Sequence, residues 1–183
     1  MVKWNKEIEF VRNKEEMNAL DKILNNPILS SEKKALSSKS RIYFHYIKGL
    51  YYFFIGNFKQ STVHFEHQWL LFQKHPHNIE ENKMMYVRTL GNHCMLQIKT
   101  GNTQKFEKCF VELTSLSTKS KHILEYIHYL VFMLNLMKLV KTEKYEKATI
   151  LINEKKKMIQ EISVEPSEDW YLAWMYVCFD SVA

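Results

Sequence analysis

Residues 49–65 read Gly49-Leu-Tyr-Tyr-Phe-Phe-Ile-Gly56-Asn-Phe58-Lys-Gln-Ser61-Thr-Val-His-Phe65, and their spacing is the most informative structural signal in the chain. Gly56 followed by Asn57 predicts the end of a helix, because glycine readily adopts the left-handed conformation that closes one. The small residues Gly49 and Ser61 let two helix backbones approach closely, and the aromatic residues around them fill the remaining space. The stretch therefore predicts two packed antiparallel helices joined by a tight turn.

The composition extends this prediction to an all-α fold. Of the 183 residues, 46% are hydrophobic, and the 11 Phe and 10 Tyr residues supply enough bulk for a core. Only four glycines and three prolines occur, which is too few for the turns of a many-stranded sandwich or barrel. Lys, Glu, Leu and Met are plentiful and favour helix.

Pro, Gly and Asn breaks divide the chain into about seven or eight antiparallel helices. The second helix begins at a cap in 30–32 and ends at Ile55, and a later one begins at a cap at Ser117 or Thr118 and ends at Val140. The other predicted helices cover residues 14–25, 58–74, 80–99, 104–116, 145–162 and 167–180.

The first helix pair resembles the tetratricopeptide repeat (TPR), whose pattern is G-x-x-Y-x-x-x-G-x-[YF]-x-x-[small]-x-x-x-[FY]. The pattern is filled in order by Gly49, Tyr52, Gly56, Phe58, Ser61 and Phe65. The resemblance implies a TPR-like α-solenoid, a right-handed superhelix that forms a single domain over residues 1–183.

The repeats after the first are degraded. The clearest repeat covers 41–75, and weaker ones cover 80–116 and 118–162, before the terminal helix 167–180. The second repeat keeps Gly91 and Gly101, while the third has Leu136 in place of the glycine and Ile152 in place of the aromatic residue. The period is roughly 40 to 48 residues, longer than the ~34 of a standard TPR.

The resemblance also implies a concave groove on the outgoing helices, where TPR domains bind peptides. The residues that correspond to groove positions are Tyr43, Tyr46, Leu50, Phe53, Met85, Arg88, Asn92 and Met95.

Arg88 and Asn92 lie one helical turn apart on the same face. This arrangement resembles part of the clamp with which some TPR domains hold a C-terminal carboxylate. The third outgoing helix offers only apolar residues at the corresponding positions, Leu130, Met133 and Met137. The sequence therefore favours the alternative of a solvated arginine and a surface asparagine.

Other residue clusters do not predict a reaction or a metal site. His64 and His67 share a helix face and could bind a transition metal, but no Cys or carboxylate pattern completes four ligands. Cys94 beside His93 does not predict a nucleophile, because adjacent helical residues face different directions. Hydrolase, nucleotide-binding and zinc-protease motifs are absent from the sequence, so we expect no catalytic residue, no cofactor and no enzyme activity.

The formal charge of +6 and the pI of about 9.1 permit binding to nucleic acid. Lysines at 138, 141, 144, 147 and 155–157 could contact phosphates. Glutamates alternate with these lysines, which is typical of a solvated helix face, and this interpretation makes nucleic acid an unlikely partner.

The terminal segment 170–179 is apolar around most of its circumference, unlike the capping helix of a solenoid. Trp170, Trp174 and Phe179 are therefore predicted to contact a second copy of the chain or further repeats. A helix buried within the same chain is the alternative.

Three cysteines without paired spacing predict free thiols in a reducing compartment. The N-terminus lacks the apolar run of a signal peptide, and the most apolar run, 123–140, is interrupted by Glu125, His128, Asn135 and Lys138. We therefore expect a cytoplasmic protein without a membrane partner.

Together these features predict a protein-interaction scaffold that binds a peptide or helix of a partner protein in an aromatic- and Met-lined groove. Two alternatives remain open. One is a ligand- or peptide-sensing regulatory domain of a larger signalling or transcription-control system. The other is a nucleic-acid-binding helical repeat.

Overall fold

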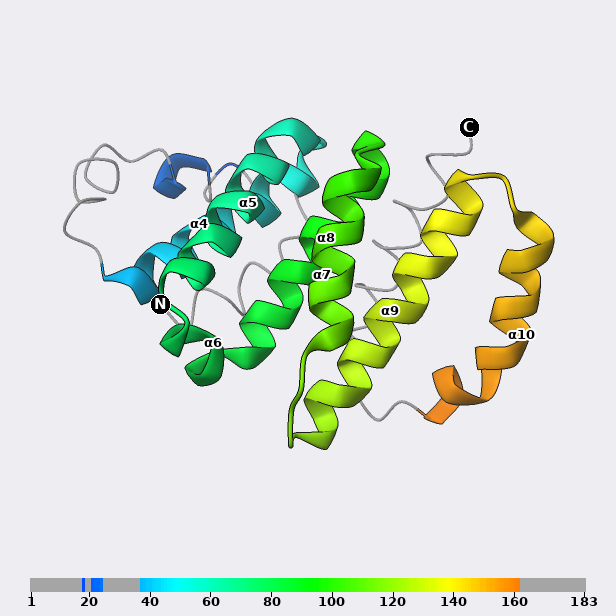
Figure 1. Cartoon of the computed structure of the whole chain (residues 1–183). Coiled ribbons are helices and arrows are strands. Elements are labelled where there is room, and N and C mark those ends of the chain that lie inside the picture. The colour runs from blue at the N-terminus through cyan, green and yellow to red at the C-terminus, as the bar shows by residue number, and fades with distance from the viewer. Residues whose placement is uncertain (1–17, 19–20, 25–36, 162–183) are drawn as a thin grey trace. The chain divides into compact units, whose positions relative to one another are not determined.

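The structure is a computed structural model that describes residue 18, residues 21–24 and residues 37–161, with side chains described up to Glu154. Every regular element in these residues is a helix, which confirms the all-α prediction (Figure 1). Most of the predicted helix 14–25, the predicted cap at 30–32 and the terminal helix 167–180 lie outside the described residues. The chain divides into two compact units, Met1–Leu96 and Gln97–Ala183.

In the first unit, α4 (Ser38–Phe54) and α5 (Phe58–Lys74) pack along their length as an antiparallel pair (Figure 1). A short α6 (His77–Glu81) follows, and α7 (Lys83–Thr100) begins in this unit. The prediction that the first of these helices runs unbroken from residues 30–32 is wrong. Ser37 is the N-cap of α4, because its Oγ accepts a hydrogen bond from the Ser40 backbone N–H at 3.1 Å.

The closest contact between α4 and α5 lies at Gly49. The Oγ of Ser61, which is fully buried, donates a hydrogen bond to the Gly49 carbonyl oxygen at 2.8 Å. The Phe65 ring lies so close that a Cβ added to Gly49 would be 2.8 Å from its Cζ. Glycine is therefore required here for close approach, as the sequence predicted.

Helix α7 is buried on nearly its whole circumference from Met85 to Ile98, with Arg88 half-buried. Such a helix belongs to the interior of a protein rather than to its surface. The Phe72 and Tyr86 rings pack 4.9 Å apart between α5 and α7 in the first unit.

The second unit contains α8 (Thr103–Ser115), α9 (Lys121–Lys141) and α10 (Tyr145–Glu161). Its core is formed mainly by α9, whose buried residues include Tyr126, Leu130, Phe132 and Leu134. The predicted cap of α9 at Ser117 or Thr118 is wrong, because Ser120 accepts a hydrogen bond from the Ile123 backbone N–H at 3.4 Å.

Three helices end in the same hydrogen-bonded turn, with a left-handed residue at Gly56, Gly101 and Glu143. In each turn, the left-handed residue donates to the carbonyl three residues back, and the next residue donates to the carbonyl five residues back. This is the Schellman motif. Gly56 and Gly101 are 45 residues apart and Gly101 and Glu143 are 42 apart, so the period is within the predicted range.

The third helix pair (α9 and α10) can be aligned with the first (α4 and α5) by matching Glu143 to Gly56. In this alignment the two pairs differ where their helices cross. Leu136 occupies the position of Gly49, Ala148 that of Ser61, and Ile152 that of Phe65. Ala148 is buried, whereas Ile152 is 42% exposed and Phe65 is fully buried. The third pair therefore has neither the glycine nor the buried aromatic ring that meet at the crossing of α4 and α5.

Among the described residues, α9 alone is long and apolar enough to cross a membrane by length and composition. In this structure 44% of its apolar stretch is buried against the rest of the protein. Core helices of soluble proteins meet the same criterion.

Gly49→Ala is expected to destabilise the protein by about 1–3 kcal/mol, because the added methyl overpacks against Phe65. The sign of the change in the free energy of unfolding is diagnostic, because Gly→Ala at an uncrowded position inside a helix stabilises by about 0.5–1 kcal/mol. Urea unfolding measures the effect. In a Phe65→Leu background the cost should largely disappear, and a stabilising Gly49→Ala in the natural background would contradict the close contact.

Glu143→Gly is expected to stabilise the protein by roughly 0.5–1 kcal/mol, because a non-glycine residue in the left-handed conformation costs about 1–2 kcal/mol, offset in part by glycine's flexibility when unfolded. Thermal unfolding of the full chain measures the gain. Glu146→Gly, in the first turn of α10, is the matched control and should destabilise. Equal losses for both variants would show that Glu143 is not strained.

Candidate functional site

The eight residues predicted to line a groove all belong to the first unit, and the structure buries most of them. The buried ones are Tyr46, Leu50, Met85, Asn92 and Met95. The half-buried ones are Tyr43, Phe53 and Arg88. A partner could contact the buried five only if neighbouring side chains moved.

Two of the aromatic residues predicted for the groove contact residues of their own helix pair. The Tyr46 ring lies edge-on to Phe65 of α5, with centroids 6.1 Å apart. The Phe53 ring lies 5.6 Å from that of Phe58, across the turn between α4 and α5. Both rings therefore contribute to the packing that holds this pair together.

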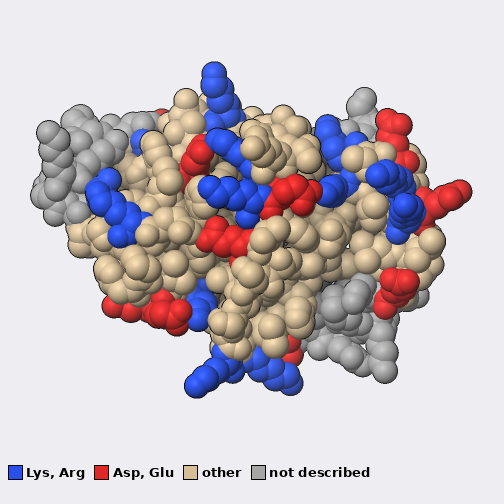
Figure 2. All heavy atoms as spheres, in the orientation of Figure 1, with Lys and Arg blue, Asp and Glu red and all other residues tan. Residues whose placement is uncertain are grey.

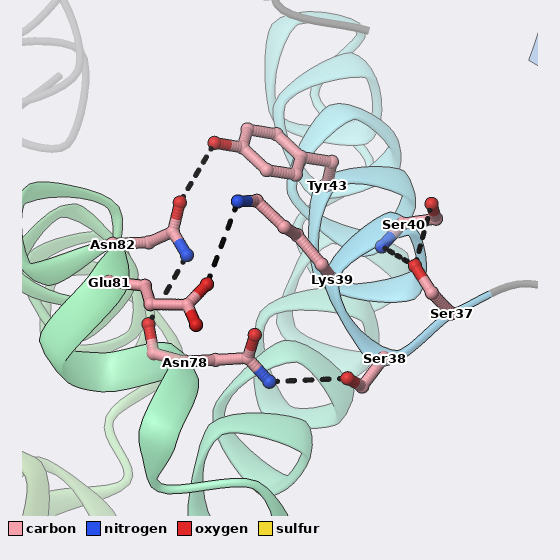
Figure 3. Close-up of polar contacts among 8 residues, drawn as sticks. All are labelled: Ser37, Ser38, Lys39, Ser40, Tyr43, Asn78, Glu81 and Asn82. Carbon is pink, nitrogen blue, oxygen red and sulfur yellow. Dashed lines mark hydrogen bonds and ion pairs between the residues drawn. The ribbon is translucent and has the colours of Figure 1, made fainter.

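Tyr43 takes part in a polar contact between the start of α4 and the region of α6 (Figure 3). Its hydroxyl donates to Asn82 Oδ1 at 3.2 Å, and the nearly buried Asn78 donates through Nδ2 to Ser38 Oγ, also at 3.2 Å. The exposed pair Lys39 and Glu81 adds an ion pair of 3.7 Å. These contacts position α6 against α4.

Arg88 and Asn92 remain a prediction as a carboxylate clamp. Asn92 is 9% exposed and Arg88 is half-buried on α7. The interpretation as a surface asparagine is wrong, because Asn92 is buried.

Three histidines meet between α4 and α5, and the sequence identified only two of them. His45 Nδ1 lies 3.0 Å from His64 Nδ1, so one ring donates a hydrogen bond to the other, and His45 packs edge-on against His67. Tyr52 stacks on His64 with centroids 5.4 Å apart. These contacts are interhelical packing, and no cluster in the described part of the chain has the geometry of a metal site.

Tyr51 anchors the helical residues 21–24 to α4. Its hydroxyl donates to Asp21 Oδ1 at 2.6 Å. Burial and this hydrogen bond to a carboxylate raise the pKa of Tyr51 to about 12, because both oppose the negative charge of a phenolate.

Cys94 and Cys109 are buried and form no disulfide with each other, as predicted for free cysteines. Cys94 is fully enclosed. A buried thiol in apolar surroundings is inert, so neither cysteine is placed to act as a nucleophile.

An open groove of about 470 Å³ lies between α9 and α10 in the second unit. Helix α9 contributes one face at a spacing of three and four residues, and α10 contributes the facing one. The lining residues are Asn135, Lys138, Leu139, Thr142, Lys144, Lys147, Ile150, Leu151 and Glu154. We call this site the α9–α10 groove.

Three of the nine residues that line the α9–α10 groove are apolar. Leu139 and Leu151 are half-buried, and Ile150 is 57% exposed. Contiguous exposed apolar surface can mark a binding site, so the groove is a candidate for one.

The charges in the α9–α10 groove differ in how far they are neutralised. Lys138 forms an ion pair with Glu107 of α8 and lies over the Phe106 ring, with 5.1 Å between its Nζ and the ring centroid. Lys144 and Lys147 are exposed and form no ion pair with any residue that the structure describes. Figure 2 shows basic and acidic side chains interspersed on the face that includes α9 and α10.

The groove has a basic end and an acidic end. Lys144 and Lys147 lie in the N-terminal part of α10, next to the turn, and Glu154 lies two turns beyond Lys147. An elongated ligand would therefore meet different charges at its two ends.

Sequence reasoning identified the lysines of this site but not its apolar residues. The sequence predicts a solvated, salt-bridged face for Lys138, Lys144 and Lys147. Of these, Lys138 forms an ion pair, with Glu107. The signal that would have identified the groove is the combination of Leu139, Ile150 and Leu151 on facing helices with a bulky residue at the crossing.

Trp170, Trp174 and Phe179, predicted to contact another chain or further repeats, lie outside the described residues.

Comparison with known proteins gives no relative. No protein-family model matches the chain, and neither a curated protein nor a solved structure does.

The raised pKa of Tyr51 predicts that the protein loses stability at alkaline pH. The raised pKa stabilises the fold fully below pH 10, the usual value for tyrosine, and this contribution is lost as the pH rises from 10 to about 12. After allowance for solvent screening we expect about 1 kcal/mol. Urea unfolding between pH 9 and 12 should show this loss relative to Tyr51→Phe, and Tyr145→Phe, at an exposed site, should behave like the natural protein. Identical pH profiles for Tyr51→Phe and the natural protein would contradict it.

Proposed function

We propose that this protein is a protein-interaction scaffold built from TPR-like helix pairs, and that it binds a peptide or helix of a partner protein in the α9–α10 groove. The observation that carries the proposal is the groove itself, which is open, contains three apolar residues and is large enough to receive side chains of a partner. The aromatic and Met residues predicted for this role are less suited to it, because five of the eight predicted residues are buried.

The repeated turn supports the TPR-like part of the proposal. Three Schellman turns at intervals of 45 and 42 residues indicate three helix pairs of related construction. In such arrays each pair buries its apolar face against its neighbours and the surface left open binds other proteins. A cytoplasmic location and the absence of enzyme activity belong to the same proposal.

The mode of binding that fits two parallel rows of side chains is a helix laid in a groove. Partner helices of this type insert apolar side chains spaced three and four residues apart. The groove presents Leu139 on one wall and Ile150 and Leu151 on the other, so a helix with two or three apolar anchors fits it.

Ile150→Asp should weaken binding of a partner strongly, because it places a charge among the apolar contacts. The expected loss is on the order of 2 kcal/mol, roughly 30-fold in affinity. Since Ile150 is mostly exposed, folding should change little. Val111→Asp on α8, at a residue 62% exposed and outside the groove, is the matched control.

The measurement tests both whether a partner binds and where on the protein it binds. A photo-cross-linking amino acid replaces Ile150 in one sample and Val111 in another, and the cross-linked partner residues are mapped by mass spectrometry. The proposal requires that one partner segment cross-links at 150 and not at 111, and that Ile150→Asp removes the partner while Val111→Asp retains it. Equal behaviour of the two positions would reject the α9–α10 groove as the binding site.

A further inference from the structure

We propose that the α9–α10 groove binds an acidic amphipathic segment, with carboxylates of the partner contacting Lys144 and Lys147 and its apolar side chains contacting Leu139, Ile150 and Leu151. This inference rests on the proposed function, and it adds the chemical class of the partner.

The first argument is the state of the lysines. Lys138 is already neutralised by Glu107, so it offers little to an incoming anion. Lys144 immediately precedes α10 and Lys147 lies in its first turn, so both charges lie at the N-terminal end of this helix. A carboxylate bound there can pair with either lysine.

The second argument is the position of Lys144 at the start of α10. In the other two Schellman turns the corresponding residues are Asn57 and Asn102, whose side chains accept hydrogen bonds from the backbone N–H groups of Gln60 and Lys105. A lysine has no acceptor and cannot cap a helix in this way. A carboxylate bound beside Lys144 would lie near the first-turn N–H groups of α10, which also favour negative charge.

The third argument is the lining of the groove, which favours an acidic peptide over a nucleic acid. Nucleic-acid sites need a positive track with aromatic side chains for stacking. No described residue that lines this groove is aromatic, and Glu154 would repel a continuous row of phosphates. A peptide can be acidic at one end and neutral or basic at the other.

The charge gradient of the groove also sets the direction of the partner. Its acidic residues should lie toward the turn at Glu143, and its neutral or basic residues toward Glu154. A segment with glutamates along its whole length should bind less well, because part of it would face Glu154.

The test is selection of a random peptide display library on the full chain, followed by fluorescence anisotropy with the selected peptides. The natural protein should enrich peptides that combine Asp or Glu with apolar residues spaced three and four apart. Lys144→Glu/Lys147→Glu should bind these peptides about tenfold more weakly, and its own selection should enrich Lys or Arg in place of the acids. The loss should shrink as salt is added.

Lys59→Glu/Lys119→Glu is the matched control, because it changes the net charge equally at two exposed lysines outside the groove. It should leave affinity within about twofold, since distant exposed charges are screened. An equal loss in both double variants would overturn the proposal, because it would reduce the effect to overall charge. The proposal would also be overturned if the natural protein enriched peptides without Asp or Glu. The same holds if Lys144→Glu/Lys147→Glu selected the same peptides as the natural protein.

Failure of this inference differs from failure of the proposed function. If Ile150→Asp removes the partner while Lys144→Glu/Lys147→Glu retains it, the groove binds a protein that is not acidic. A single-stranded oligonucleotide tests the nucleic-acid alternative. If it binds the natural protein, and if Lys144→Glu/Lys147→Glu weakens this binding while Ile150→Asp does not, the site contacts nucleic acid. The acidic-peptide proposal is then wrong. If none of the groove variants changes binding of any probe, both proposals fail.

Discussion

The structure of the first unit depends on one contact, in which the backbone of Gly49 meets Phe65 and Ser61. The absent Cβ lets the Phe65 ring lie against α4, and the Ser61 hydroxyl donates to the Gly49 carbonyl within the same buried space. The hydrogen bond matters because Ser61 is fully enclosed, and a buried hydroxyl without an acceptor would cost about 1–3 kcal/mol. Close packing and polar satisfaction are thus met by the same three residues, which fixes how α4 and α5 cross.

The third helix pair keeps the turn of the first pair but loses this contact. Leu136 stands where close approach would need glycine, and the smaller Ile152 replaces the aromatic ring. The pair still closes with a Schellman motif, although Glu143 must adopt a left-handed conformation that glycine adopts more easily. The third pair thus retains the turn without the close packing at the crossing, and an open groove lies between its two helices.

The sequence predicted those parts of the fold that depend on local chemistry. The Gly56-Asn57 and Gly101-Asn102 turns define α5 and α8 closely, because glycine and asparagine have a specific role at a helix junction. The caps at Ser37 and Ser120 were missed, since several serines and threonines in each segment can serve and only tertiary packing selects one. Site prediction was harder for the same reason. The TPR resemblance implies that Tyr46 and Met95 face a groove, but it does not tell whether another helix covers them, and both are buried.

The departures from ideal local structure in the third pair are concentrated around the α9–α10 groove. Glu143 has a strained conformation, Lys144 cannot cap α10, and Ile150 is exposed although it is apolar. Each departure costs stability, and each would be relieved by a simple substitution that the first two turns already contain or that any polar residue could supply. A bound segment that supplies carboxylates and apolar side chains would pair the lysine charges and cover the exposed apolar side chain. This agreement between what the groove lacks and what such a partner offers is the physical reason to regard the α9–α10 groove as a binding site rather than as loosely packed surface.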